Sequence, residues 1–310
     1  MENNVQNIIG QIVKAKENES PPFEFSPSAS VKVSSVNVEE IIKTIVLTYH
    51  NDWEKQKLGF AREFLSRTWS GIPLPVLSVC GRGTQEIRYS TYLGYFLDHS
   101  KPHGLSTRYL DEILLLLGFK ELDTYKSIVY TEKWLGQSKD AKGIVDCFCD
   151  IVISTKTHWI FIEQKINSGE SQNPNSETSQ LLRYDQAIAN NTEFYGKKQI
   201  RIFLTPAGKI SQKSPEWQSL SYKNLVTAGF DTLKSGGLSN IARENLKRFL
   251  MDLLLGPFEK AESEIQEIIA AAEKVVYNTN VTDRDKFVER LHFDQLVSDN
   301  RLLVDLLMEG

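Results

Sequence analysis

The stretch GIVDCFCDIVISTKTHWIFIEQKI, residues 143–166, decides the fold, because its composition predicts two neighbouring strands. Residues 143–154 and 158–166 are rich in β-branched and aromatic residues, and the polar segment TKT (155–157) between them predicts a tight turn. The second strand is apolar on both faces, which is typical of a central, buried strand. These residues therefore predict a hairpin inside a covered sheet.

Charged residues interrupt the end of the second strand. Side chains alternate along a strand, so Trp159, Phe161, Glu163 and Lys165 are expected on one face. Charges at buried positions need partners or a metal ion. An ordinary salt bridge at a strand end is an alternative explanation for Glu163 and Lys165.

The first strand carries an acid at the matching end. Alternation predicts that Asp146, Phe148, Asp150 and Val152 share one face, and a hairpin through 155–157 would bring Asp150 near Glu163. Two neighbouring carboxylates repel each other unless one is protonated or a cation lies between them. Mg²⁺ prefers oxygen ligands, so the pair is a candidate metal site.

Two helices contribute further candidates. Glu86 lies at the start of the predicted helix 84–100, on the same stripe as Tyr89 and Leu93. A glutamate favoured by the helix dipole is the alternative explanation. Gln180 and Tyr184 lie one turn apart on the helix expected from about 179 to 190, although such pairs also occur on ordinary helices.

Together these motifs resemble the PD-(D/E)XK nuclease superfamily, and most closely its bacterial branch with an IExKI…QLxRY arrangement. The resemblance covers roughly residues 84–255. The motif is carried by Glu86, CDIVI with Asp150, IEQK with Glu163 and Lys165, and QLLRY with Gln180 and Tyr184. This sequence departs from the pattern in having Cys149, not proline, before Asp150, and in a long loop between Lys165 and Gln180.

The resemblance implies a metal site and a reaction. Asp150, Glu163 and the backbone carbonyl of Gln164 would hold Mg²⁺ or Mn²⁺, with Glu86 as a direct or outer ligand. The activity implied is phosphodiester hydrolysis by a metal-dependent nuclease. DNA is implied as the substrate because it is the usual one for this superfamily, and a role in defence against foreign DNA rests on family analogy alone.

The remaining motif residues have implied positioning roles. Lys165 would position the attacking water, and Gln180 and Tyr184 would orient Lys165 or the substrate strand. His103, in the turn KPHGL (101–105), is a further candidate for contact with the substrate. Two alternatives stay open: a non-catalytic or partner-activated binding or assembly subunit on a nuclease scaffold, and an RNase that uses the same site.

The element order predicts the fold class and three regions. Helices precede a hairpin with a polar turn at GQSKDAK (136–142), and a further helix, a strand and closing helices follow. This order predicts an α/β (α+β) mixed sheet, and the resemblance implies a restriction-endonuclease-like core with helical additions at both ends. The expected regions are an N-terminal helical extension (1–80, with a helix at 1–16 and a linker at 17–35), a nuclease core (81–255) and a C-terminal helical extension (256–310).

The C-terminal region is expected to contain helices at about 258–277 and 282–308. Terminal helices of this kind could mediate self-association or bind a protein partner.

Composition excludes several classes of protein. The chain has 310 residues, a net charge of −4 and 41% hydrophobic residues, and its locally basic stretch is 197–213. It has no apolar run of the roughly 20 residues that a membrane span needs and no signal-peptide pattern, so a cytoplasmic location is expected.

The cysteines do not indicate a disulfide or zinc site. There are three, and Cys147 and Cys149 are expected to be core residues, since no second ligand pair accompanies them. The sequence also lacks GxxxxGK[ST], so no nucleotide-driven motor is predicted.

Overall fold

A computed structural model describes residues 38–82, 85–140, 143–166, 179–211, 213–255, 261–278 and 282–309. The predicted helix at 1–16 and linker at 17–35 lie outside these residues. The chain divides into two compact units, Met1–Thr48 and Tyr49–Gly310. In the first unit the described residues belong to α2 (Val38–Gln56), where the Thr44 hydroxyl donates to the Glu40 carbonyl.

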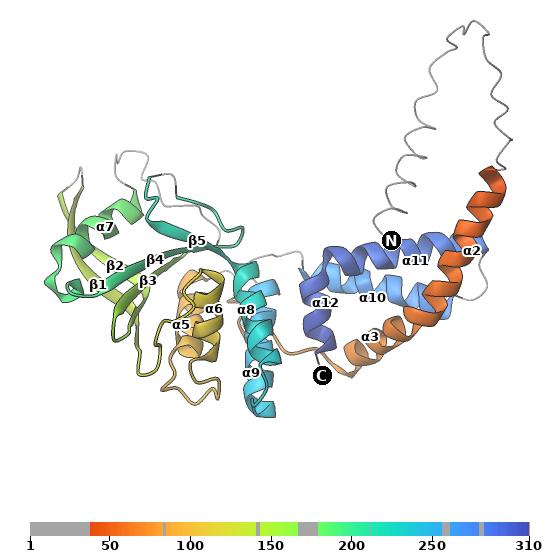
Figure 1. Ribbon diagram of the computed structural model, residues 1–310, viewed down its shortest axis with the longest axis horizontal. Helices are drawn as coiled ribbons and strands as arrows, with labels where there is room; N and C mark the ends of the chain where they lie inside the picture. Colours follow the sequence, from red (N-terminus) through yellow and green to blue (C-terminus); the bar gives the residue numbers. More distant parts are fainter. Residues whose placement is uncertain are drawn as a thin grey trace, which may run out of the picture. The chain divides into compact units, whose positions relative to one another are not determined.

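The second unit contains a mixed five-stranded sheet in the order β1-β2-β3-β4-β5 (Figure 1). β1, β2 and β3 pair antiparallel, whereas β3, β4 and β5 pair parallel. The sheet confirms the predicted fold class and the hairpin through 155–157. The strands are β1 (Ile128–Asp140), β2 (Gly143–Ser154), β3 (His158–Gln164), β4 (Lys198–Thr205) and β5 (Trp217–Ser221).

The polar turn predicted at 136–142 is wrong for most of its length. β1 continues to Asp140, which pairs with Gly143. The register shifts between Trp134 and Gly136, and Gly136 has a φ of 125°. This β-bulge accommodates one extra residue in β1, so the polar residues after Gly136 still pair with β2.

The predicted alternation along β2 also fails at one point. Cys147 and Cys149 share a hydrophobic cluster with Val152, whereas Ile151 belongs to the cluster on the other side. The alternation therefore changes phase around Asp150, and Val152 does not share the exposed face of Phe148. The physical reason lies in β1, where Glu132 has a φ of 52° at the point facing Asp150 and disturbs the ladder. The predicted burial of both cysteines is confirmed.

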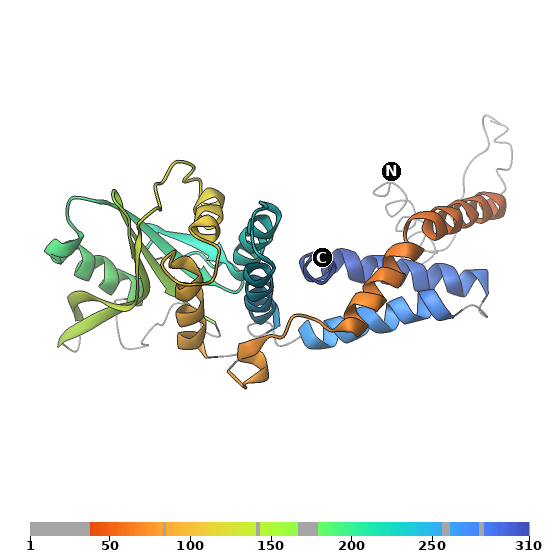
Figure 2. The ribbon, with the colours of Figure 1, turned by 90° about the horizontal axis from the view of Figure 1, so that it is seen from below.

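Helices cover the sheet on both faces (Figures 1 and 2). Ile160 and Ile162 of β3 pack with residues of α5 and α6, whereas Trp159 and Phe161 pack with residues of α7. The short 3-10 helix η1 (Thr192–Phe194) follows α7. The helices around the sheet are α5 (Glu86–Leu97), α6 (Arg108–Leu116), α7 (Gln180–Asn190), α8 (Tyr222–Lys234) and α9 (Asn240–Leu255).

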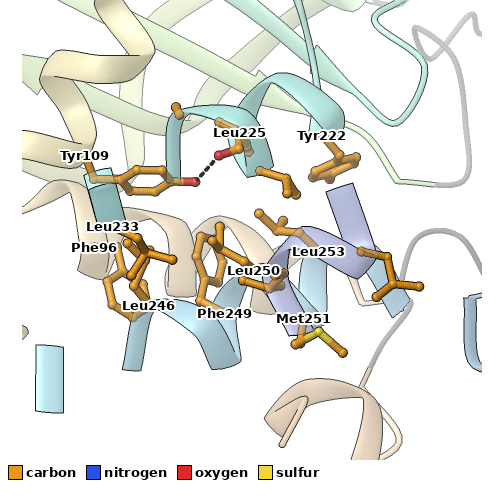
Figure 3. Close-up of a cluster of buried hydrophobic side chains, with 14 of the residues drawn as sticks. Phe96, Tyr109, Tyr222, Leu225, Leu233, Leu246, Phe249, Leu250, Met251 and Leu253 are labelled. Atoms are coloured by element: carbon orange, nitrogen blue, oxygen red, sulfur yellow. Dashed lines mark hydrogen bonds between the residues drawn. The ribbon is translucent and has the colours of Figure 1, made fainter. Parts of the chain in front are cut away.

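α5, α6, α8 and α9 share an aromatic core (Figure 3). Phe249 stacks on Phe96, with ring centroids 5.0 Å apart. The Tyr109 hydroxyl donates to the Leu225 carbonyl at 3.1 Å and so joins α6 to α8. Gly229 allows α8 to approach α9 closely, because a Cβ atom there would lie 2.5 Å from the Leu250 side chain.

We expect Tyr109→Phe to lower the free energy of unfolding by about 1–2 kcal/mol. The substitution keeps the buried ring and leaves the buried Leu225 carbonyl without this donor. Urea denaturation of both proteins measures the difference. Tyr195→Phe is the control, because the Tyr195 hydroxyl also donates to a carbonyl, that of Ala189, but from an exposed position. Equal losses in the two variants would contradict the expectation.

Further helices of the second unit pack on one another. α3 packs on α10 and α12, and the Asp294 carboxylate of α11 accepts hydrogen bonds from Tyr49, Trp53 and Lys57. Within residues 71–82, which the structure describes, the one helix has four residues, as the Pro and Gly content of this stretch predicts. These elements are α3 (Leu58–Ser70), α4 (Val76–Val79), α10 (Ala261–Tyr277), α11 (Asp283–Asp299) and α12 (Arg301–Met308).

The single helix predicted at 282–308 is two helices. Asn300 separates α11 from α12 and leaves the helical conformation, with φ −109° and ψ 31°. Its side-chain amide donates to the Leu296 carbonyl, which is the local competition with the backbone that disfavours asparagine inside helices. In the part of the chain that is described, no helix combines the length and apolarity of a membrane span.

Candidate active site

Four elements bring the predicted polar residues to one edge of the sheet. Asp150 lies in β2, and the pairing of Ile151 with Ile162 places it opposite Glu163 near the end of β3. Lys165 follows directly after β3. Glu86 is the first residue of α5, and Gln180 is the first residue of α7.

Lys165 joins two of the acids. Its Nζ atom lies 2.7 Å from Glu163 Oε1 and 2.8 Å from Glu86 Oε1. The second Glu86 oxygen, Oε2, accepts a hydrogen bond from the Ile166 backbone N–H at 3.1 Å. Glu86 thus holds both the lysine side chain and the backbone that follows it.

Asp150 is tied to the backbone of β3. Its Oδ2 atom accepts a hydrogen bond of 2.7 Å from the Gln164 N–H. Burial raises the pKa of Asp150 to about 6, and the negative charges of Glu86 and Glu132 add to this effect, while the Gln164 N–H and the charge of Lys165 oppose it.

Gln180 and Tyr184 extend the network from α7. The Gln180 amide donates to Glu163 Oε1 at 2.8 Å and to the Tyr184 hydroxyl at 2.7 Å. α7 begins at this point because the Ser179 side chain caps it by accepting from the Leu182 N–H. The Oε1 atom of Glu163 therefore accepts hydrogen bonds from both Lys165 and Gln180.

Glu163 is the most deeply buried acid of this group. Only 1% of its surface is exposed, and its Oε2 atom has no hydrogen-bond partner. Burial and the charge of Asp150 raise the pKa of Glu163 to about 8, against the opposing effect of Lys165. Burial works against the charge of Lys165, but the carboxylates of Glu163 and Glu86 outweigh it and raise the pKa of Lys165.

This chemistry fits a hard divalent cation. A buried carboxylate oxygen without a partner, next to a second carboxylate, costs free energy that a cation would offset. Among the described residues no three His, Cys, Asp or Glu side chains form a cluster that could hold a metal ion. The predicted backbone carbonyl of Gln164 would therefore have to complete the set with Asp150 and Glu163, because both Glu86 oxygens are occupied.

One predicted contact does not reach this site. Both His103 ring nitrogens are used within its own turn, by the Asp98 carbonyl and the Leu105 N–H. The ring is 1% exposed and packs against Tyr95 and Phe96, so the suggestion that it contacts substrate is wrong.

One residue near the site, Tyr222, was not predicted from the sequence. The Tyr222 hydroxyl lies 3.5 Å from the Lys165 carbonyl, and Tyr222 is the first residue of α8. The capping box formed by Ser221 and Asn224 marks this helix start in the sequence and could have located it.

The mixed sheet, with two acids and a lysine at one edge between α5 and α7, has the arrangement that the resemblance implies. Residues 75–252 of the 310 match the family model described as the PD-(D/E)XK nuclease superfamily, and the chain belongs to that superfamily. The predicted resemblance to this superfamily is thereby confirmed, and the assignment to its bacterial branch stays a prediction. No curated protein and no solved structure matches the chain.

Proposed function

We propose that this protein is a nuclease that hydrolyses phosphodiester bonds with the help of Mg²⁺ or Mn²⁺, bound by Asp150, Glu163 and the Gln164 carbonyl. The observation that carries the proposal is the partnerless Glu163 Oε2, buried beside Asp150 and within the network of Lys165. A protein without chemistry at this edge would gain stability by replacing such a group with an apolar one.

A bound divalent cation would polarise the phosphoryl oxygen and offset the charge of the two acids. Lys165 would position the attacking water and stabilise the developing negative charge, because its ammonium group is fixed between Glu163 and Glu86. Glu86 is a positioning residue in this proposal, since it engages Lys165 and the Ile166 N–H. Gln180 and Tyr184 orient the Glu163 carboxylate.

The proposed substrate is DNA. The proposed role is defence against foreign DNA in the cytoplasm. Both rest on the usual properties of the superfamily. The net charge of −4 gives no general attraction to nucleic acid, so the cation and local basic residues would have to supply it. An RNase using the same site, and a partner-activated subunit, are the outcomes that the experiment must separate from this proposal.

The test is cleavage of linear, circular and single-stranded DNA and of RNA with Mg²⁺, Mn²⁺ or EDTA, by the wild type and by Lys165→Ala. We expect metal-dependent cleavage of DNA that falls by about 10²–10³-fold in the variant, the scale of losing one electrostatic group in an active site.

Lys247→Ala is the matched control, because Lys247 is as buried as Lys165 but pairs with Glu244 and the Glu309 carbonyl. It should retain cleavage at a temperature where the protein stays folded. Cleavage of RNA alone would select the RNase. An inactive wild type that nevertheless binds Mn²⁺ in calorimetry would favour a partner-activated subunit.

A further inference from the structure

Two aromatic rings are paired across β1 and β2 on the surface of the hairpin. Trp134 and Phe148 are cross-strand partners and are 45% and 47% exposed. Cross-strand partners project from the same face of a sheet, so the two rings form one exposed aromatic pair. Exposed neighbouring aromatic rings cost solvation free energy and are typical of binding surfaces.

The aromatic pair is not part of the core. Leu135 and Cys147, the next residues along β1 and β2, are buried in the cluster that includes residues of α7. Trp134 and Phe148 project from the opposite face, which α7 does not cover. Burial of Leu135 and Cys147 against α7 is thus enough to stabilise the hairpin. The exposure of Trp134 and Phe148 on the other face is not explained by folding.

The Trp134 ring is held in a fixed orientation. Its Nε1–H donates to Asp146 Oδ1 at 3.1 Å, and Gln137 donates to the same oxygen at 3.2 Å. These bonds use the edge of the indole and give Asp146 Oδ1 two donors. The face of the ring is left for stacking, with little entropy to lose on binding.

The aromatic pair lies close to Asp150 of the candidate active site along β2. Phe148 precedes Asp150 by two residues in β2, a rise of about 7 Å along a strand. Farther along the same hairpin, Lys139 is exposed and pairs with Ile144. An extended ligand that runs past Asp150 and along the side of the hairpin away from α7 would therefore meet the two rings and then a positive charge.

We propose that Trp134 and Phe148 form a stacking platform for unpaired bases of the substrate strand, next to the phosphodiester that is cut. This inference rests on the proposed function and specifies its substrate as nucleic acid with a single-stranded segment. Bases in a duplex are stacked on one another and cannot offer a face to these rings, whereas unpaired bases can. Stacking tolerates any base, so the platform selects strandedness and not sequence.

Cleavage of matched substrates tests the proposal. Each variant is given a single strand and a fully paired circular duplex of the same sequence, and kcat/KM is measured with Mn²⁺. We expect Trp134→Ala and Phe148→Ala to lower kcat/KM for the single strand by about 5- to 100-fold, the scale of base–aromatic stacking, with less than a threefold change for the duplex. Trp134→Phe should restore cleavage, because it keeps a ring.

Tyr195→Ala is the control, since Tyr195 is 59% exposed and follows Phe194, which is buried in the α7-side cluster. It should cut both substrates like the wild type. Equal losses on single strand and duplex, or no loss on either, would overturn the platform. So would a wild-type dimer that Trp134→Ala dissociates in sedimentation, because the rings would then be a protein interface.

Binding separates this proposal from the proposed function. Binding of a labelled twelve-thymidine strand to Lys165→Ala protein is measured by fluorescence anisotropy. This variant is used because the measurement requires binding and not cleavage. Weaker binding after adding Trp134→Ala supports the platform, even if the wild type cuts no substrate and the proposed function fails. Cleavage that persists while neither ring affects binding refutes the platform alone.

Discussion

Replacing Glu163 by glutamine is expected to lower metal-dependent cleavage by at least about a hundredfold. Glutamine has nearly the same shape, and its carbonyl oxygen can still accept the hydrogen bond from Gln180. It has no charge to hold a cation and no second carboxylate oxygen to replace the partnerless Oε2. Single-turnover cleavage with Mn²⁺, together with calorimetric titration of Mn²⁺, measures both effects.

The control for this variant is Glu193→Gln. Glu193 is a more exposed acid that pairs with Lys133 at 2.8 Å, and exposed pairs contribute less than about 1 kcal/mol. Its cleavage rate and Mn²⁺ affinity should stay within about threefold of the wild type. If Glu163→Gln cuts as fast as this control, Glu163 is not a metal ligand and the site assignment must be abandoned.

The central part of the fold was predictable because its side-chain pattern has one physical solution. Residues 158–166 are apolar on both faces, which requires a covered strand, and the turn at 155–157 requires an antiparallel neighbour. From that pairing the approach of Asp150 to Glu163 follows directly. The placement of Gln180 one turn before Tyr184 followed in the same way from the helical period.

The details that failed depend on backbone conformations that leave no clear trace in composition. The left-handed conformation of Glu132 shifts the phase of β2, although glutamate rarely adopts it. The irregularity at Gly136 lets a polar segment continue as a strand, where polar residues with a glycine usually indicate a turn. Sequence patterns also gave no role to Trp134, because its exposure follows from which face α7 covers.

The hydrogen-bond partners of Glu86 within the site were not predictable either. Glu86 was expected as a metal ligand, but whether it contacts the cation or Lys165 depends on side-chain geometry that spacing does not define. In the structure its two oxygens engage Lys165 and the Ile166 N–H. The division of the chain into regions 1–80, 81–255 and 256–310 stays a prediction.

The buried acids predict that the metal-free protein loses stability as pH rises from about 5 to 8. The pKa of Glu163 is about 8 in the folded protein, above its ordinary value of 4.5, and that of Asp150 is about 6, above 3.8. Between its unfolded and folded pKa, each group holds more protons in the folded chain than in the unfolded chain. The free energy of unfolding therefore falls with rising pH, by up to about 1.4 kcal/mol per pH unit for each group.

Comparison with Glu163→Gln isolates the larger of these contributions. Burial also raises the pKa of other acids, among them Asp252 and Asp185, so the total slope contains their effects as well. The difference between wild type and variant removes them. Urea denaturation in EDTA at several pH values should show the variant gaining stability relative to the wild type between about pH 5 and 8.

Saturating Mn²⁺ should reverse this trend, because a cation binds the ionised acids and stabilises the folded state by mass action. The wild type would then gain stability as pH rises through the same range, and Glu163→Gln would gain little. Parallel pH profiles for the two proteins in EDTA would show that Glu163 ionises as an ordinary acid. Such a result would remove the physical basis for placing the cation there, because a Glu163 of ordinary pKa is not the desolvated, partnerless acid whose charge a metal ion would offset.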